Sequence, residues 1–272
     1  MSAPQPDPEG LRYSRYWEPV LAGPATRMLQ RIEASPDDYL DIGAGTGSLT
    51  LATAERWPAS RIISLDASAG MLSVARHRVA TAPTADDPGR FEWLVADAAA
   101  IPLEDESVDV VTSAFMLQLV ADRPRVLREV RRVLRPGGLF GLVTWIADEL
   151  GLEADDGFDE VVAELGLDGA NDGFRPARTT DYKSVDEAEA ELRAAGFSAV
   201  DAREEVLRYA WTRADYLEFK RRFDDHELFD SLSDSDRTRL SDAVRARWEP
   251  LADDAFAVSG PLVSALACRP LE

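Results

Sequence analysis

The sequence contains very few residues able to form disulfides or bind soft metal ions. Its single cysteine, Cys268, excludes an internal disulfide and a cysteine-based metal cluster. Two histidines, His77 and His226, are too few for a histidine-rich zinc or iron site. Both stand in charged surroundings, so we expect them at the surface, with contact between His226 and a substrate as the alternative. The sequence therefore predicts no metal site.

Long apolar segments are also missing. No stretch approaches the roughly 18 uninterrupted apolar residues that a membrane-spanning helix needs. Residues 1–10 are polar and rich in proline, without the basic start and apolar middle of a secretory signal. We therefore expect residues 1–10 to be a disordered lead-in, and the protein to be cytoplasmic without a membrane span.

Lysine is nearly absent, and negative charge dominates the chain. Lys183 and Lys220 are the only lysines, and the formal net charge is -20. Nucleic-acid phosphates reward clustered Lys and Arg, so this charge disfavours nucleic acid as a partner. An acidic, lysine-poor surface suits a salt-rich cytoplasm, although a GC-rich genome also explains arginine in place of lysine.

Strand and helix patterns alternate through the first half of the 272 residues. Helical spacing is expected over 17–32, 48–57, 68–80 and 124–134, and buried strands over 39–42, 61–65, 91–96, 108–113 and 139–144. Strands rich in Val, Ile and Leu between helices are typical of a parallel sheet covered on both faces. With right-handed crossovers and two further strands in the second half of the chain, this pattern predicts an α/β fold with a doubly wound, mostly parallel seven-stranded sheet.

The second half of the chain is less regular. We expect helices near 159–165 and over 185–195, strands over 199–207 and 262–268, and a largely helical stretch over 212–248 between these strands. The helical stretch is interpreted as a cap at about 207–255, inserted before the last strand of a single domain spanning 11–272. Nothing in the sequence indicates an oligomeric state.

A glycine run after the first strand indicates the kind of ligand. Asp41 precedes glycines at alternate positions, Gly43, Gly45 and Gly47. The dinucleotide fingerprint G-x-G-x-x-G requires a third glycine where this chain has Ser48. A carboxylate so close to the loop suits a cationic ligand better than a pyrophosphate. The spacing therefore favours S-adenosylmethionine (SAM), which carries an ammonium and a sulfonium.

Acidic residues also follow the next two strands. Asp41 closes the first strand, Asp66 closes the second, and Asp97 follows the third. Ligands of open parallel sheets bind at the carboxyl ends of the strands, so each aspartate can meet a different part of one nucleoside. An acid after the second strand is well placed for both ribose hydroxyls. The alternative is that these residues merely cap helices or turns.

Five sequence blocks occur in the order seen in one enzyme family. They are Tyr39–Gly47, Leu65–Leu72, Ala96–Ala98, Pro102–Val111 and Glu129–Gly138. In these blocks the chain resembles class I SAM-dependent methyltransferases, most of all the small-molecule branch that includes the ubiquinone and menaquinone C-methyltransferases. The resemblance is good from Tyr39 to Thr144 and loose beyond.

The resemblance implies a set of cofactor-binding residues. Asp41 and the loop of Gly43, Ala44, Gly45 and Gly47 would hold the methionine part of SAM. The ribose would lie on Asp66, beside Ala67 and Met71. The adenine would meet Asp97 and the backbone of Ala98.

Further residues are expected around the transferable methyl group. By the same resemblance Ser113, after the fourth strand, would line the pocket there. An N-terminal helix often closes over the cofactor in this family, so Tyr16 and Trp17 are candidates to shield the sulfonium by cation–π attraction. Packing of that helix on the sheet is an equally good interpretation of both rings, and the better one for Tyr13.

The expected activity is methyl transfer from SAM to an unidentified small-molecule acceptor by in-line displacement. The cofactor supplies the reactivity, and the protein aligns donor and acceptor and excludes water. No histidine stands at a strand end, so no catalytic residue is named. Two alternatives remain: an NAD(P)-dependent oxidoreductase with a variant Rossmann loop, and a SAM-binding protein without catalysis.

Overall fold

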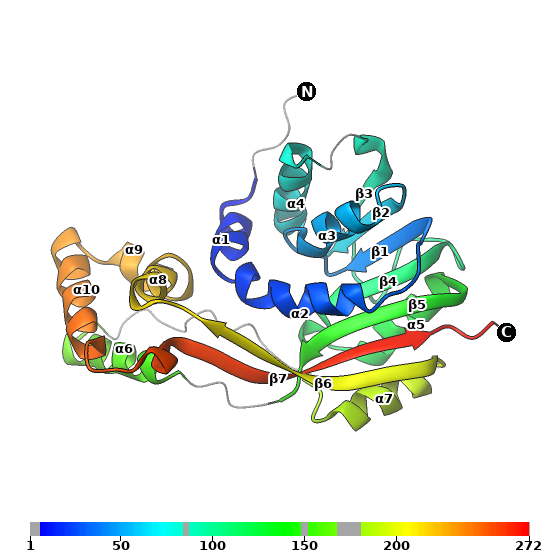
Figure 1. Ribbon diagram of the computed structural model, residues 1–272. Helices are drawn as coiled ribbons and strands as arrows, with labels where there is room; N and C mark the ends of the chain where they lie inside the picture. Colours follow the sequence, from blue (N-terminus) through cyan, green and yellow to red (C-terminus); the bar gives the residue numbers. More distant parts are fainter. Residues whose placement is uncertain (1–5, 84–86, 148–151, 168–180, 272) are drawn as a thin grey trace. The chain divides into compact units, whose positions relative to one another are not determined.

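The computed structural model describes residues 6–83, 87–147, 152–167 and 181–271 (Figure 1). Contacts within the chain divide it into two compact units. The first, called the sheet unit below, comprises Met1–Ala147, Arg178–Glu205 and Pro261–Glu272. The second, called the helical unit, comprises Asp148–Ala177 and Val206–Gly260, which includes the residues expected to form the cap.

The strands form one seven-stranded sheet, as the sequence predicts. In chain order they are β1 (Asp38–Ile42), β2 (Arg61–Asp66), β3 (Phe91–Val95), β4 (Val108–Ala114), β5 (Leu134–Trp145), β6 (Ser198–Ala210) and β7 (Ala257–Cys268). Their order in the sheet is β3-β2-β1-β4-β5-β7-β6. The pairs among β1 to β5 are parallel, and β7 pairs antiparallel with β5. The order reverses direction between β1 and β4, where open α/β sheets bind their ligands.

Helices of the sheet unit cover both faces of the sheet (Figure 1). They are α1 (Pro8–Tyr16), α2 (Glu18–Gln30), α3 (Ser48–Arg56), α4 (Ala69–Thr81), η1 (Pro88–Arg90), η2 (Leu117–Leu119), α5 (Arg123–Val133) and α7 (Val185–Ala194). Successive residues of β5 point to opposite faces of the sheet. Phe140 and Leu142 belong to the buried cluster formed with α5 and α7. Gly141, between them, faces Met28 of α2, whose Sδ atom lies 2.7 Å from the place of a Cβ.

The start of the chain differs from the expected disordered lead-in. Residues 8–10 form the first turn of α1, and residues 1–5 lie outside the described part of the chain. The Asp7 carboxylate accepts the Gly10 N–H at 2.8 Å, which caps the helix. Pro8 occupies the first helical turn, where a missing N–H costs nothing. A proline-rich, polar composition is therefore compatible with a capped helix here.

The helical unit consists mainly of helices around aromatic side chains, together with residues 206–210 of β6 and 257–260 of β7. Its helices are α6 (Glu153–Glu164), α8 (Arg213–Phe219), the π-helical turn η3 (Lys220–Asp224), α9 (His226–Ser231), α10 (Asp234–Trp248) and η4 (Asp253–Phe256). The buried ring of Tyr216 packs at 5.6 Å from Trp248 and 5.8 Å from Phe256, measured between centroids. Most of the stretch 212–248 is helical, as expected, but it is divided into several helices. Among the described helices, none combines the length and the apolar character needed to cross a bilayer.

Candidate functional site

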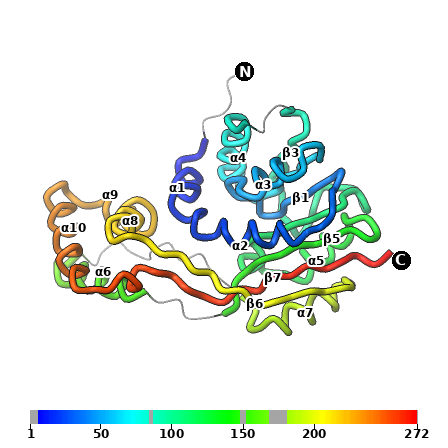
Figure 2. The backbone as a smooth tube through the Cα atoms, viewed as in Figure 1, coloured from blue at the N-terminus to red at the C-terminus, as the bar shows by residue number. Residues whose placement is uncertain are grey.

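The glycine run forms the turn that connects β1 to α3 (Figure 2). Gly43, Gly45 and Gly47 have φ angles of +71°, +55° and +86°, a region that side chains with a Cβ rarely adopt. The N–H groups of Gly43 and Ala44 donate to the Leu65 carbonyl at 2.8 and 3.0 Å. The run therefore folds back against the end of β2 and leads directly into the N-terminus of α3.

Asp41 lies on β1 and is buried, with 1% of its surface exposed. Its Oδ1 atom accepts the Thr112 hydroxyl of β4 at 3.1 Å, and Thr112 also shares a hydrogen bond with the hydroxyl of Tyr39. Burial raises the pKa of Asp41 to about 7, the Thr112 hydrogen bond opposes the rise, and the charge of Asp66 adds to it. A carboxylate with this pKa favours a neighbouring cation, because the cation stabilises its ionised form.

Asp66, the last residue of β2, holds the glycine run in place. Its Oδ2 atom accepts the Gly45 N–H and its Oδ1 atom accepts the Ser68 N–H, both at 2.8 Å. Burial raises the pKa of Asp66, and these two backbone hydrogen bonds oppose the rise. Each carboxylate oxygen retains acceptor capacity for a ligand hydroxyl.

Asp97 follows β3 and is exposed, and its Oδ1 atom accepts the Ala99 N–H at 2.8 Å. Ala98 beside it is buried. The strands β3, β2 and β1 are consecutive in the sheet. Their carboxyl ends therefore bring three carboxylates into one row, those of Asp97, Asp66 and Asp41. The expected arrangement of acids at successive strand ends is therefore present.

A cavity of about 60 Å³ lies beside the glycine run. Asp41, Gly43, Ala44 and Gly45 line it, together with residues of α1, α2 and the end of β4. These further residues include Tyr13, Glu18, Leu21, Ala114 and Phe115. The cavity is much smaller than a nucleoside, because the N-terminal helices occupy the space in front of the run.

Glu18 connects the N-terminal helices to this site. Its Oε2 atom accepts a hydrogen bond from the Arg78 guanidinium at 2.6 Å and another from the Thr46 hydroxyl. Arg78 donates in addition to the Thr46 carbonyl at 2.7 Å. No sequence pattern indicates Glu18, Thr46 or Arg78 as site residues, since their contacts join segments far apart in the chain.

Tyr13, rather than the two aromatic residues favoured from sequence, lines the cavity. Burial raises the pKa of the Tyr13 phenol well above its usual range, and the charges of Glu18 and Asp66 add to this. Tyr16 and Trp17 are not among the lining residues that the structure describes: Tyr16 carries the Arg15 guanidinium at 5.4 Å from its ring, and Trp17 stands between α1 and α2. The helical phase of α1 decides between these rings, and the sequence pattern predicted a helix only from residue 17 onward.

The turn after β4 forms another wall of the cavity. Phe115 has a φ angle of +54°, and its carbonyl accepts the Gln118 amide at 2.6 Å. The Gln118 carbonyl oxygen in turn accepts the Thr144 hydroxyl at 2.6 Å, and both residues are buried. The Phe115 ring lies 5.5 Å from that of Trp145. Gln118 and Thr144 thus hold a strained turn, a role that sequence inspection missed.

Ser113 is buried at the end of β4, and its hydroxyl has no hydrogen-bond partner among the residues that the structure describes. Ala67 is exposed, and Met71 is half-buried in the first turn of α4. His226 belongs to the helical unit, where its Nδ1 atom lies 2.8 Å from the Phe223 carbonyl oxygen. In the part of the chain that the structure describes, no group of His, Cys, Asp and Glu side chains is able to hold a metal ion.

Comparisons with known proteins match part of this chain to methyltransferases. A methyltransferase domain family matches residues 40–142. The malonyl-[acyl-carrier protein] O-methyltransferase of Methylococcus capsulatus is 34% identical over 197 residues, 70% of this chain and 61% of that protein. The ubiquinone/menaquinone biosynthesis C-methyltransferase UbiE of Geobacter sulfurreducens is 42% identical over 100 residues, 36% of this chain and 38% of that protein.

The fold also matches solved structures. The YcgJ protein of Bacillus subtilis aligns with a TM-score of 0.57 at 20% identity, over 91% of this chain and 97% of that one. The matches to the curated relatives cover less than two thirds of the length of either relative. The matched segment contains the glycine run, the three aspartates and strands β4 and most of β5. Residues 40–142 thus match a methyltransferase domain, and over this domain the chain is similar to class I SAM-dependent methyltransferases.

Proposed function

We propose that the protein transfers a methyl group from SAM to a small-molecule acceptor in the cytoplasm. One relationship carries the proposal: a buried carboxylate, Asp41, lines the same cavity as a glycine run that Asp66 holds through the Gly45 N–H. The anion and the open backbone suit a ligand that is cationic at one end and bears hydroxyls further along.

The residues around the run fit SAM. A Cβ at Gly45 would meet only the Gly43 carbonyl oxygen, at 4.0 Å, so no side chain crowds the backbone at this position. Asp41 supplies a buried negative charge for the ammonium, and Asp66 supplies acceptors for ribose hydroxyls. Asp97 stands at the next strand end, and we assign to it, with the Ala98 backbone, the adenine amino group. Ala67 and Met71 stay proposed as neighbours of the ribose.

The bound cofactor supplies an electrophilic methyl group on a sulfonium. The chain has to hold the donor, position the acceptor and keep water away. Asp41, once ionised, orients the amino-acid end of the donor by hydrogen bonding. Phe115 and Tyr13 add apolar surface that excludes water from the cavity, and Ser113 stays proposed as a pocket residue. Tyr16 and Trp17 are kept as shielding candidates of lower rank than Tyr13.

The acceptor is proposed only as a small molecule. The relatives are named as a C-methyltransferase of ubiquinone/menaquinone biosynthesis and a malonyl-[acyl-carrier protein] O-methyltransferase, so their names differ in the kind of atom that receives the methyl group. No side chain among the described residues of the cavity other than carboxylates and Tyr13 is a candidate base. We therefore propose catalysis that rests mainly on proximity.

Calorimetric titration of the full chain with SAM, S-adenosylhomocysteine and NADH tests the cofactor. We expect binding of the first two and no binding of NADH. NADH binding without SAM binding would overturn the proposal in favour of an oxidoreductase.

Turnover separates an enzyme from a binding protein. Release of S-adenosylhomocysteine is measured with quinol, carboxylic acid and amine acceptors, and with Asp41→Asn as the matched inactive variant. We expect release with at least one acceptor class and its loss in the variant. SAM binding without release from any acceptor supports the non-catalytic alternative.

A further inference from the structure

A second, larger recess lies in the sheet unit, with a volume of about 610 Å³. It is lined by α5, by the end of α7, by Asp105 before β4 and by Arg269 after β7. Asp105 precedes β4, whereas Phe115 of the first cavity follows it. A strand of this length measures about 20 Å, so the two sites lie at opposite edges of the sheet.

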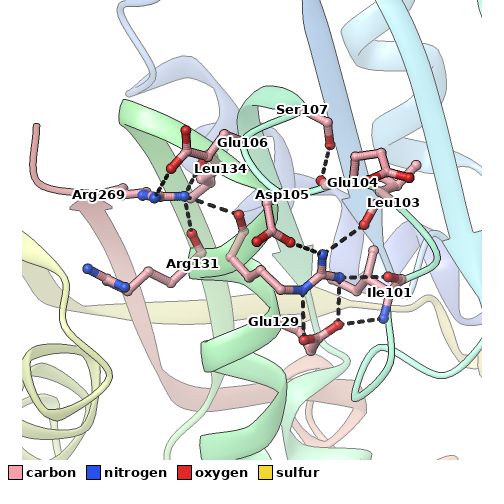
Figure 3. Close-up of polar contacts among 11 residues, drawn as sticks. Ile101, Leu103, Glu104, Asp105, Glu106, Ser107, Glu129, Arg131, Leu134 and Arg269 are labelled. Atoms are coloured by element: carbon pink, nitrogen blue, oxygen red, sulfur yellow. Dashed lines mark hydrogen bonds and ion pairs between the residues drawn. The ribbon is translucent and has the colours of Figure 1, made fainter. Parts of the chain in front are cut away.

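Two arginines of this recess are held rigidly. Arg132 donates to both carboxylate oxygens of Glu129 at 2.9 and 2.8 Å, and to Asp105 and the Leu103 and Ile101 carbonyls at 2.8 Å. Arg269 donates to the carbonyls of Arg131, Arg132 and Leu134 and pairs with Glu106 (Figure 3). The guanidinium groups of Arg132 and Arg269 are thus paired with acids and carbonyl groups, which fixes this side of the recess.

Two further arginines line the recess without an acidic partner among the described residues. Arg131 donates its Nε–H to the Gly196 carbonyl at 3.2 Å, and Figure 3 shows its side chain extending away from the Arg269 network. Its terminal amino groups are therefore oriented and available. Arg128, one turn earlier on α5, is exposed and also lines the recess. Like charges three residues apart on a helix repel each other unless an anion lies between them.

The acids of the recess do not neutralise these two charges. Asp105 pairs with Arg132 at 2.8 Å, and Glu191 pairs with Arg123 at 2.6 Å. The chain as a whole carries a net charge of -20, and yet α5 carries five arginines against one glutamate. Positive charge is therefore concentrated on one helix, around an open recess.

We propose that this recess binds a small phosphate-bearing anion, with Arg128 and Arg131 as the residues that contact it. A guanidinium group presents paired N–H donors that match two phosphate oxygens, which makes arginine suited to this task. The volume falls within the range of roughly 300–1,000 Å³ typical of small-molecule sites. The proposal is independent of the methyl-transfer reaction, because the site lies at the other edge of the sheet.

Titration calorimetry of the full chain with inorganic pyrophosphate at low ionic strength tests the proposal. We expect binding with a Kd below about 1 mM, weakened at least about tenfold in Arg128→Gln and further in the double variant with Arg131→Gln. Arg128 is exposed, so Arg128→Gln leaves the fold intact. This single variant therefore tests the site even if the double variant, which loses the Arg131–Gly196 contact, is destabilised. A parallel titration with adenosine diphosphate distinguishes a nucleotide from a simple phosphate, and either result supports the site.

Arg125→Gln is the matched control, because Arg125 is exposed on the same helix but does not line the recess. We expect it to bind pyrophosphate as the unmodified chain does. Equal weakening by this control would show only general attraction to α5 and would overturn the proposal. Absence of pyrophosphate binding, binding of polyglutamate alone, or displacement of pyrophosphate by SAM would overturn it as well.

Discussion

The Asp66 carboxylate accepts the backbone N–H of Gly45 at 2.8 Å, across 21 positions of the sequence. One side chain at the end of β2 thereby fixes the conformation of the turn after β1. The same carboxylate accepts the Ser68 N–H, so its orientation is set from both sides. Loop geometry and the proposed ribose contact therefore depend on one residue.

Asp66→Ala is expected to weaken SAM binding by at least about tenfold, since it removes both a charged acceptor and the hydrogen bond to Gly45. Calorimetric titration with SAM measures this. Asp87→Ala is the control, because Asp87 likewise accepts a backbone N–H, that of Gly89 at 2.9 Å, but lies outside the site. Unchanged SAM affinity in Asp66→Ala would contradict the assignment.

Asp41 is expected to make SAM binding depend on pH around neutrality. Burial raises its pKa to about 7, so below that pH the unliganded protein holds a proton there. The ammonium of SAM favours the ionised carboxylate, and binding should therefore release part of a proton near pH 6–7. Titrations in buffers of different ionisation enthalpy measure the release, which should vanish in Asp41→Asn and near pH 9.

The same raised pKa has a consequence for stability. A carboxyl whose pKa is higher in the folded than in the unfolded state stabilises the fold at acidic pH, and this contribution is lost as pH rises from about 4 to about 7. The midpoint temperature of thermal unfolding without ligand should thus fall more steeply between about pH 4 and pH 7 in the unmodified chain than in Asp41→Asn. Parallel curves for the two proteins would show that the Asp41 pKa is ordinary.

Gly45→Ala should separate ligand binding from folding. The φ angle of +55° costs an alanine about 1–2 kcal/mol, but no atom blocks the new Cβ. We expect this modest loss of stability together with a large loss of SAM affinity, because the methyl group would project toward the ligand. Gly166→Ala, with φ +68° and nothing within 4 Å, should lose similar stability and bind SAM normally. Equal SAM affinity of the two variants would place the ligand elsewhere.

Ser113→Ala is expected to leave stability unchanged or to raise it slightly, because the buried Ser113 hydroxyl has no hydrogen-bond partner in the described part of the chain. Ser64→Ala is the matched comparison: Ser64 is equally buried and shares a hydrogen bond of 2.8 Å with Thr50. Loss of this hydrogen bond in Ser64→Ala should lower the free energy of unfolding by about 1 kcal/mol. Denaturant unfolding measures both. If Ser113→Ala instead lowers turnover without affecting stability, the hydroxyl acts on the acceptor or the methyl group.

Local patterns in the sequence were enough to predict the sheet and the glycine run. Period-two and apolar runs identify the strands, and Gly43, Gly45 and Gly47 all have the positive φ angles that only glycine adopts readily. Asp41, Asp66 and Asp97 could be placed because parallel strands end at one edge of a sheet. Each of these inferences depends on neighbours in sequence and on a general rule of topology.

Contacts between distant segments were beyond such patterns. The helix α1 begins in a proline-rich segment, and its phase, which turns Tyr13 rather than Tyr16 toward the cavity, depends on packing against the sheet unit. The Glu18–Arg78 pair and the Gln118–Thr144 pair join residues that no spacing relates. The pairing of arginines along α5 is likewise invisible until Asp105 and Glu191 are placed.

The sequence by itself determined the fold class, the order of its strands along the chain and the chemical character of the glycine run, because backbone preferences and strand polarity are local properties. Only the tertiary structure decided which aromatic ring lines the cavity, how deeply Asp41 is buried, and which arginines of α5 have no acidic partner among the described residues. Those properties depend on burial and on partners brought together by folding, and neither is encoded at a fixed distance along the chain.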